Sequence, residues 1–148
     1  MSGDDVASIR QGLTKLYETS GLNPDVVLTT EPGGNPWGLL LAAVCNKNLA
    51  IARQADGVCN TPTLLALQRN GYRHCKLAIP KLPVGSTVLF IEDVISTGGT
   101  LKTLAAALHE QDVIALGAIC IVRKQMDSFP ELGFPIFSMY HDQVSISN

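Results

Sequence analysis

The chain has 148 residues, of which 46% are hydrophobic and 16% charged, and its formal net charge is −2. These values predict one folded domain over residues 1–148 and exclude a disordered chain. The small net charge gives no electrostatic basis for binding nucleic acid or a membrane surface, and no apolar run is long enough to span a bilayer.

The N-terminus and the cysteines together predict a cytoplasmic protein. The first five residues include two acids and lack the apolar core of a signal peptide. The four cysteines form no C-x-x-C pair and no zinc-binding pattern. Cys45 and Cys120 lie in apolar segments, where free buried thiols are common. We therefore expect reduced thiols and a reducing compartment.

Strands and helices are expected to alternate along most of the chain. Apolar spacing and composition predict helices at residues 6–19, 37–44 and 101–108, the second apolar on nearly all sides and therefore buried. Short apolar runs predict strands at residues 25–30, 49–53, 75–79, 88–91 and 113–122. Residues 54–73 form the least regular region, with a possible helical turn at 63–68. Two short strands, 134–140 and 144–146, are expected to pair at the end of the chain.

This alternation predicts an α/β fold in which a mainly parallel sheet has helices on both faces. Ligands of such sheets bind at the carboxyl ends of the strands. Three loops are expected there, at residues 31–36, 54–73 and 92–100. We expect them to converge on one cleft.

Residues 88–100 carry the strongest functional signal. Four apolar residues predict a strand covered on both faces, and two acids, Glu92 and Asp93, follow them. Buried carboxylates without partners are unfavourable, so both acids are expected to face a polar cleft. The next turn offers hydroxyls, backbone N–H groups and the positive end of a helix dipole, which suit an anion. Acids suited to hydroxyls or Mg2+ beside a phosphate-binding turn predict a sugar phosphate ligand.

The run Glu92-Asp93-Val94-Ile95-Ser96-Thr97-Gly98-Gly99-Thr100 resembles the phosphoribosyl-diphosphate signature of type I phosphoribosyltransferases. The resemblance implies that Glu92 and Asp93 hold the ribose 2′- and 3′-hydroxyls, directly or through Mg2+. It implies that Thr97, Gly98, Gly99 and Thr100 hold the 5′-phosphate, assisted by Ser96. By order of elements it extends over residues 25–122. The resemblance also implies a homodimer and a base-binding hood, which is reduced here because the terminal segments are short.

Three further parts of the chain are assigned by their position in this family. The loop after the first strand would bind the diphosphate through the backbone N–H groups of Gly33 and Gly34, and Glu31 matches an acid found in the purine enzymes. Arg53 would pair with the diphosphate through its guanidinium, or alternatively with a surface acid. Residues 54–73 match in position the mobile catalytic loop that closes over the sugar.

The resemblance implies an enzyme of purine salvage that transfers the 5-phosphoribosyl group from phosphoribosyl diphosphate to a purine base and releases diphosphate, with Mg2+ as cofactor. An alternative is a non-catalytic or weakly active regulatory protein that binds phosphoribosyl ligands on the same fold. The alternative is favoured by the lack of a lysine in residues 54–73 and by the proline-rich first loop. The intact run from Glu92 to Thr100 favours the enzyme.

Overall fold

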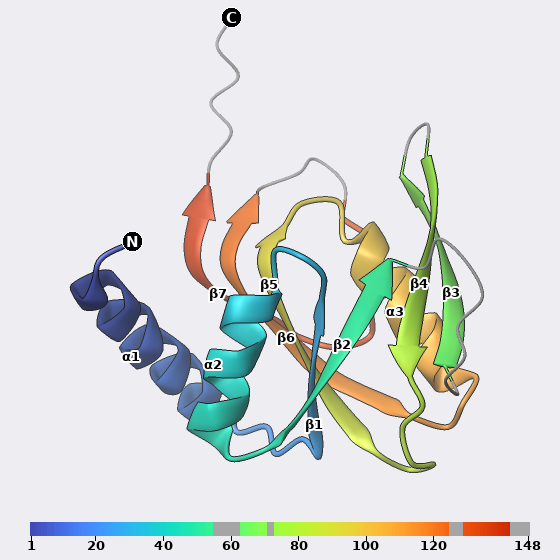
Figure 1. Cartoon of the computed structure of the whole chain (residues 1–148), viewed down its shortest axis with the longest axis horizontal. Helices are drawn as coiled ribbons and strands as arrows, with labels where there is room; N and C mark the ends of the chain where they lie inside the picture. The colour runs from blue at the N-terminus through green and yellow to red at the C-terminus, as the bar shows by residue number, and fades with distance from the viewer. Residues whose placement is uncertain (55–62, 71–72, 125–128, 143–148) are drawn as a thin grey trace, which may run out of the picture.

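The structure is a computed structural model, and it describes residues 1–54, 63–70, 73–124 and 129–142. The described strands form one seven-stranded sheet in the order β3-β4-β2-β1-β5-β6-β7 (Figure 1). The strand bounds are β1 (Val26–Thr30), β2 (Asn48–Gln54), β3 (Thr63–Asn70), β4 (Arg73–Pro80), β5 (Thr87–Ile95), β6 (Ile114–Lys124) and β7 (Ile136–Asp142). The pairs β2–β1, β1–β5, β5–β6 and β6–β7 are parallel, whereas β4 pairs antiparallel with both β2 and β3. The predicted α/β fold with a mainly parallel sheet is therefore confirmed.

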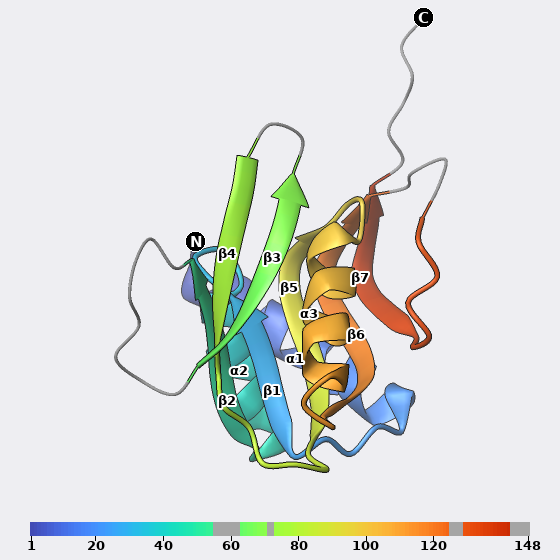
Figure 2. The ribbon, with the colours of Figure 1, turned by 90° about the vertical axis from the view of Figure 1, so that its right-hand side faces the viewer.

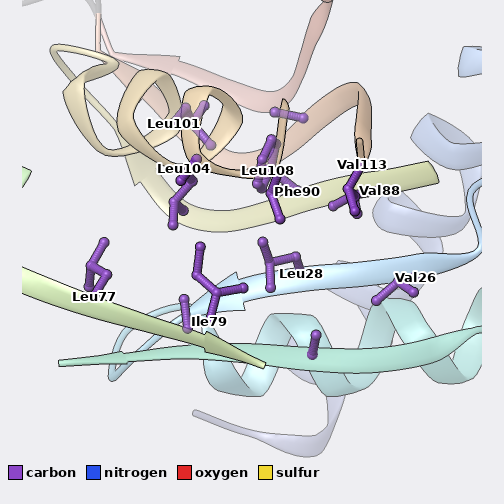
Figure 3. Close-up of a cluster of buried hydrophobic side chains, with 14 of the residues drawn as sticks. Val26, Leu28, Leu77, Ile79, Val88, Phe90, Leu101, Leu104, Leu108 and Val113 are labelled. Carbon is purple, nitrogen blue, oxygen red and sulfur yellow. The ribbon is translucent and has the colours of Figure 1, made fainter. Parts of the chain in front are cut away.

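The helices cover both faces of the sheet, as predicted. Figure 2 shows α1 (Gly3–Ser20) and α2 (Asn35–Cys45) on one side and α3 (Gly99–His109) on the other. Each face has its own apolar core. On the α3 side, Leu101, Leu104 and Leu108 face Phe90 and Leu28 (Figure 3). Because both faces are covered, the central strands are apolar on both sides.

The first helix begins earlier than its apolar spacing predicts, because Ser2 caps it. The Ser2 hydroxyl accepts a hydrogen bond from the Asp5 N–H at 3.2 Å, and the Asp5 carboxylate accepts one from the Ser2 N–H at 2.8 Å. This reciprocal pair satisfies two backbone donors at the start of the helix. None of the described helices is long and apolar enough to cross a membrane.

Two local predictions are wrong. Residues 63–68 form part of β3 and not a helical turn, because this apolar run pairs along its whole length with β4. A short apolar run fits either conformation by its periodicity, and pairing decides between them. The helix α2 is not buried on nearly all sides, since Leu39 is 65% exposed. It packs against α1 and the sheet, which leaves its outer side uncovered.

The end of the chain also differs from the prediction. The segment expected to form half of a terminal strand pair is β7, which pairs parallel with β6 and extends the main sheet. Residues 144–146, the expected partner, lie outside the described residues. Residues 55–62 and 71–72 of the predicted catalytic loop also lie outside them.

Candidate functional site

The loops that follow β1 and β5 meet at the carboxyl edge of the sheet. The two strands are parallel neighbours, and β2 lies on the other side of β1, so all three end at the same edge, the upper one in Figure 1. There, Arg53 Nε lies 3.9 Å from Glu31 Oε1. The Asp93 carboxylate lies directly against Gly33. The structure thus brings together candidate residues of the first loop, of the end of β2 and of the run from Glu92 to Thr100.

The turn between β5 and α3 forms a small polar cavity. Gly98 precedes the first residue of α3 in the left-handed conformation, at φ 74°, which glycine adopts without a steric penalty. The Gly99 N–H donates a hydrogen bond to the Thr97 hydroxyl at 3.3 Å. The cavity has a volume of about 60 Å³ and is lined by Glu92, Val94, Ile95, Ser96, Thr97, Gly98, Gly99, Thr100 and Leu101. A helix N-terminus opening on a cavity of this size suits one phosphate group.

Glu92 is a buried carboxylate at one side of this cavity. Its exposed fraction is 7%, and the Thr30 hydroxyl lies 2.7 Å from both of its oxygens. Burial raises the pKa of Glu92 to about 7, the hydrogen bond from Thr30 opposes this rise, and the charge of Asp93 adds to it. Such a carboxyl group holds or releases a proton near neutral pH.

Asp93 points to the other side of the strand. Successive side chains of a strand alternate between the two faces, so Glu92 and Asp93 diverge. Asp93 Oδ1 accepts a hydrogen bond from the Val94 N–H at 2.8 Å. A Cβ atom added to Gly33 would overlap Asp93 Oδ2 and lie 2.8 Å from Asp93 Cγ. Glu92 therefore faces the polar cavity, as expected, whereas Asp93 is half-buried beside the first loop, so the two acids do not share one cleft.

The first loop turns sharply from β1 into α2. It contains a cis peptide bond between Glu31 and Pro32, and the Gly34 N–H donates to the Thr30 carbonyl at 3.1 Å. Gly34 has no room for a side chain, because the Thr29 hydroxyl occupies that space. Arg53 is 68% exposed and pairs with Glu31, so the surface-acid alternative for Arg53 describes this structure. Both partners are candidate site residues, and their ion pair joins the first loop to β2.

Three contacts at this edge were not predicted from the sequence. Thr30 holds Glu92, and its only local signal is a polar residue at the end of a buried strand. Phe129 and Pro130 pack against Gly98, where an added Cβ atom would lie 2.7 Å from the Phe129 ring. The Arg123 guanidinium lies 4.9 Å from the centre of that ring. No sequence motif marks Phe129, because its role depends on where the chain returns after β6.

Residues 5–136 match the family described as the phosphoribosyl transferase domain. The chain belongs to this family. The resemblance of residues 92–100 to the type I phosphoribosyltransferases is thereby confirmed.

Similar proteins include one relative found by sequence and two solved structures with the same fold. The hypoxanthine/guanine phosphoribosyltransferase of Ferroglobus placidus is 26% identical over 140 residues, which cover 93% of this chain and 74% of the relative. The crystal structure of adenine phosphoribosyltransferase from Rhodothermus marinus has a TM-score of 0.77 at 19% identity, covering 90% of this chain and 78% of that chain. The crystal structure of adenine phosphoribosyl transferase from Trypanosoma brucei, in complex with AMP, pyrophosphate and ribose-5-phosphate, has a TM-score of 0.73 at 14% identity. The match covers 93% of this chain and 66% of that chain. At these identities the two structures establish the shared fold.

Proposed function

We propose that this protein transfers the 5-phosphoribosyl group from phosphoribosyl diphosphate to a purine base and releases diphosphate. The observation that carries the proposal is that Glu92 lines the same small cavity as the turn from Ser96 to Thr100. A carboxylate suited to sugar hydroxyls and a turn suited to phosphate thus stand side by side. Membership of the phosphoribosyl transferase family supports the reaction, and the purine enzymes among its relatives support a purine as acceptor.

The run from Glu92 to Thr100 would hold the ribose 5-phosphate part of the substrate. The 5′-phosphate would lie in the cavity, bound by the turn composed of Ser96, Thr97, Gly98, Gly99 and Thr100. Glu92 would accept hydrogen bonds from the ribose hydroxyls on the inner side of β5. Asp93 would approach the same sugar from the side of the first loop, because its carboxylate lies against Gly33.

The diphosphate would lie between the first loop and the end of β2. Gly33 and Gly34 precede α2, whose N-terminal end favours negative charge. Arg53 now pairs with Glu31 at 3.9 Å and is largely exposed. Its guanidinium could exchange this single carboxylate for two oxygens of a diphosphate, which it binds more strongly.

Mg2+ is the proposed cofactor. The described residues contain no group of three or more side chains that could bind a metal ion by themselves. The half-buried carboxylate of Asp93 beside Gly33 fits a small cation that takes few protein ligands and completes its shell with water and substrate oxygens. Asp93 would hold it directly and Glu92 indirectly, through the ribose hydroxyls. When bound, Mg2+ would neutralise part of the diphosphate charge.

The chain's own contribution to the reaction is positioning and electrostatic stabilisation. The bond from the ribose to the diphosphate oxygen breaks first, and the diphosphate leaves with the bonding electron pair. The sugar then carries positive charge until the base nitrogen forms its bond to the same carbon and loses its proton to water. Holding the 5′-phosphate and the ribose hydroxyls at fixed points aligns the sugar between its two partners. The carboxylates of Glu92 and Asp93 stabilise the positive charge as it develops.

We also propose a homodimer and a cytoplasmic location, with the whole chain acting as one domain and without nucleic acid or membrane as partner. The helix α2 has no charged residue, and Leu39 is 65% exposed on its outer side, which suits a second copy of the chain. Cys45 and Cys120 are free thiols, as expected in a reducing compartment.

One assay tests the activity. The protein is incubated with phosphoribosyl diphosphate, Mg2+ and, in turn, adenine, hypoxanthine, guanine, xanthine, uracil or orotate, and diphosphate release is measured. Release with a purine supports the proposal, and Asp93→Asn should abolish it. If no base gives diphosphate release but phosphoribosyl diphosphate still raises the melting temperature, the result would support the regulatory binding protein. If there is neither diphosphate release nor a rise in melting temperature, both the enzyme and the regulatory binding protein are refuted.

A further inference from the structure

Thr30 contacts both halves of the proposed site. Its hydroxyl lies 2.7 Å from Oε1 and 2.7 Å from Oε2 of Glu92, and its carbonyl accepts a hydrogen bond from the Gly34 N–H at 3.1 Å. Thr30 and Glu92 are both buried, with exposed fractions of 9% and 7%. Thr30 therefore joins Glu92, which lines the cavity between β5 and α3, to the loop that precedes α2.

The contact lies where the backbone pairing of β1 and β5 ends. The last pair in register is Thr29 with Ile91, and Thr30 and Glu92 are the next residues on the two strands. Beyond this point the strands continue into separate loops. The hydrogen bond between the two side chains extends the connection one residue further, to the edge at which the ligand would bind.

The contact with Thr30 also leaves part of the carboxylate available. The Thr30 hydroxyl is equally distant from both Glu92 oxygens, so it lies midway between them. A hydroxyl has a single proton, and it donates to one oxygen at a time. The Thr30 backbone also hydrogen-bonds this carboxylate. A carboxylate has about four acceptor positions, so some of them remain for other donors. Thr30 thus restricts the orientation of the carboxylate and leaves acceptor positions for sugar hydroxyls.

We propose that Thr30 is a positioning residue for the phosphoribosyl ligand. It fixes the Glu92 carboxylate in the orientation that receives the ribose hydroxyls, and it couples this orientation to the loop that holds the diphosphate. This inference rests on the proposed function, because it assigns Thr30 a role in binding the same substrate.

The neighbouring threonine provides a matched control. Thr29 is fully buried in the same strand but points to the opposite face, where it packs against Gly34 and Gly38. Among the described residues its hydroxyl has no hydrogen-bond partner. Thr29→Val and Thr30→Val therefore make the same chemical change one residue apart, and only the second removes a contact to Glu92.

The test compares steady-state kinetics of the wild type with Thr30→Val, Thr30→Ser and Thr29→Val. Thr30→Val should raise KM for phosphoribosyl diphosphate about tenfold, as expected for the loss of one hydrogen bond to a charged group, and change KM for the purine by less than about twofold. Thr30→Ser keeps the hydroxyl and should restore KM to within about threefold of wild type. Thr29→Val should behave as wild type.

Unchanged KM for phosphoribosyl diphosphate in Thr30→Val, with an active wild type, would overturn the positioning role and leave the proposed function intact. An equal loss in Thr29→Val and Thr30→Val would also overturn it, because it would indicate a general effect on β1. Should Thr30→Val fail to fold, Thr30→Ala carries the same prediction. A wild type without turnover and without thermal stabilisation by phosphoribosyl diphosphate would refute the proposed function and this inference together.

Discussion

Replacing Glu92 with Gln exchanges a buried carboxyl group for a neutral amide of nearly the same shape, and it should remove a pH dependence of stability. The pKa of Glu92 is about 7 in the folded protein, against an ordinary value of 4.5, chiefly because burial disfavours the charge. The folded state therefore keeps this proton over a pH range in which the unfolded state has lost it. Stability from this group is fully present below about pH 4.5 and is lost as pH rises through about 7. A pKa difference of roughly 2.5 corresponds to about 3 kcal/mol.

The assay is urea unfolding of wild type and Glu92→Gln at several pH values from about 4.5 to about 8. Subtracting the two free energies of unfolding cancels the contribution of all other titrating groups. The difference should move in favour of the Gln variant by about 2 to 3 kcal/mol as pH rises. Glu110→Gln, which removes an exposed carboxylate at the end of α3, controls for the loss of one negative charge. A difference that does not change with pH would refute the burial of Glu92 and the reasoning drawn from it.

Three further substitutions test other parts of the structure. Gly98→Ala should destabilise the protein by about 1 to 2 kcal/mol in urea unfolding, because φ at Gly98 is positive and the Phe129 ring occupies the space for a side chain. Gly99→Ala is the control and should destabilise the protein by less than about 1 kcal/mol, because the added methyl group lies 3.5 Å from the Thr97 hydroxyl without overlap. Gly33→Ala should displace the Asp93 carboxylate and weaken binding of phosphoribosyl diphosphate with Mg2+ by about tenfold in calorimetry, and unchanged affinity would argue against Asp93 as a ligand. Leu39→Lys should convert the proposed homodimer to monomers in light scattering, and a dimer that persists would exclude this face of α2.

Much of the fold was predictable because its signals are local. Apolar residues at helical spacing are enough to predict α1, and a run of four apolar residues predicts the middle of β5. The alternation of such elements leads to a parallel sheet, since a strand followed by a helix returns most easily as a parallel neighbour. β3 was not predictable in this way, because its conformation depends on pairing with β4 and not on its own periodicity.

The turn from Ser96 to Thr100, which we propose binds phosphate, was also predictable as a turn, because its chemistry lies in consecutive residues. The hydroxyls, the two glycines and the start of a helix from Ser96 onward form one short turn whatever the rest of the chain does. Local sequence is therefore enough to predict that a turn rich in hydroxyls and glycines follows two acids at the end of a buried strand.

The tertiary structure decided how those acids are used. The pleat of β5 directs Glu92 inward and Asp93 toward Gly33, although they are neighbours in the chain. The partner of Glu92 is Thr30, which is 62 residues away and reaches it only because β1 and β5 pair in parallel. Orientation and burial of a side chain depend on what the fold places opposite it, and no local pattern contains that information.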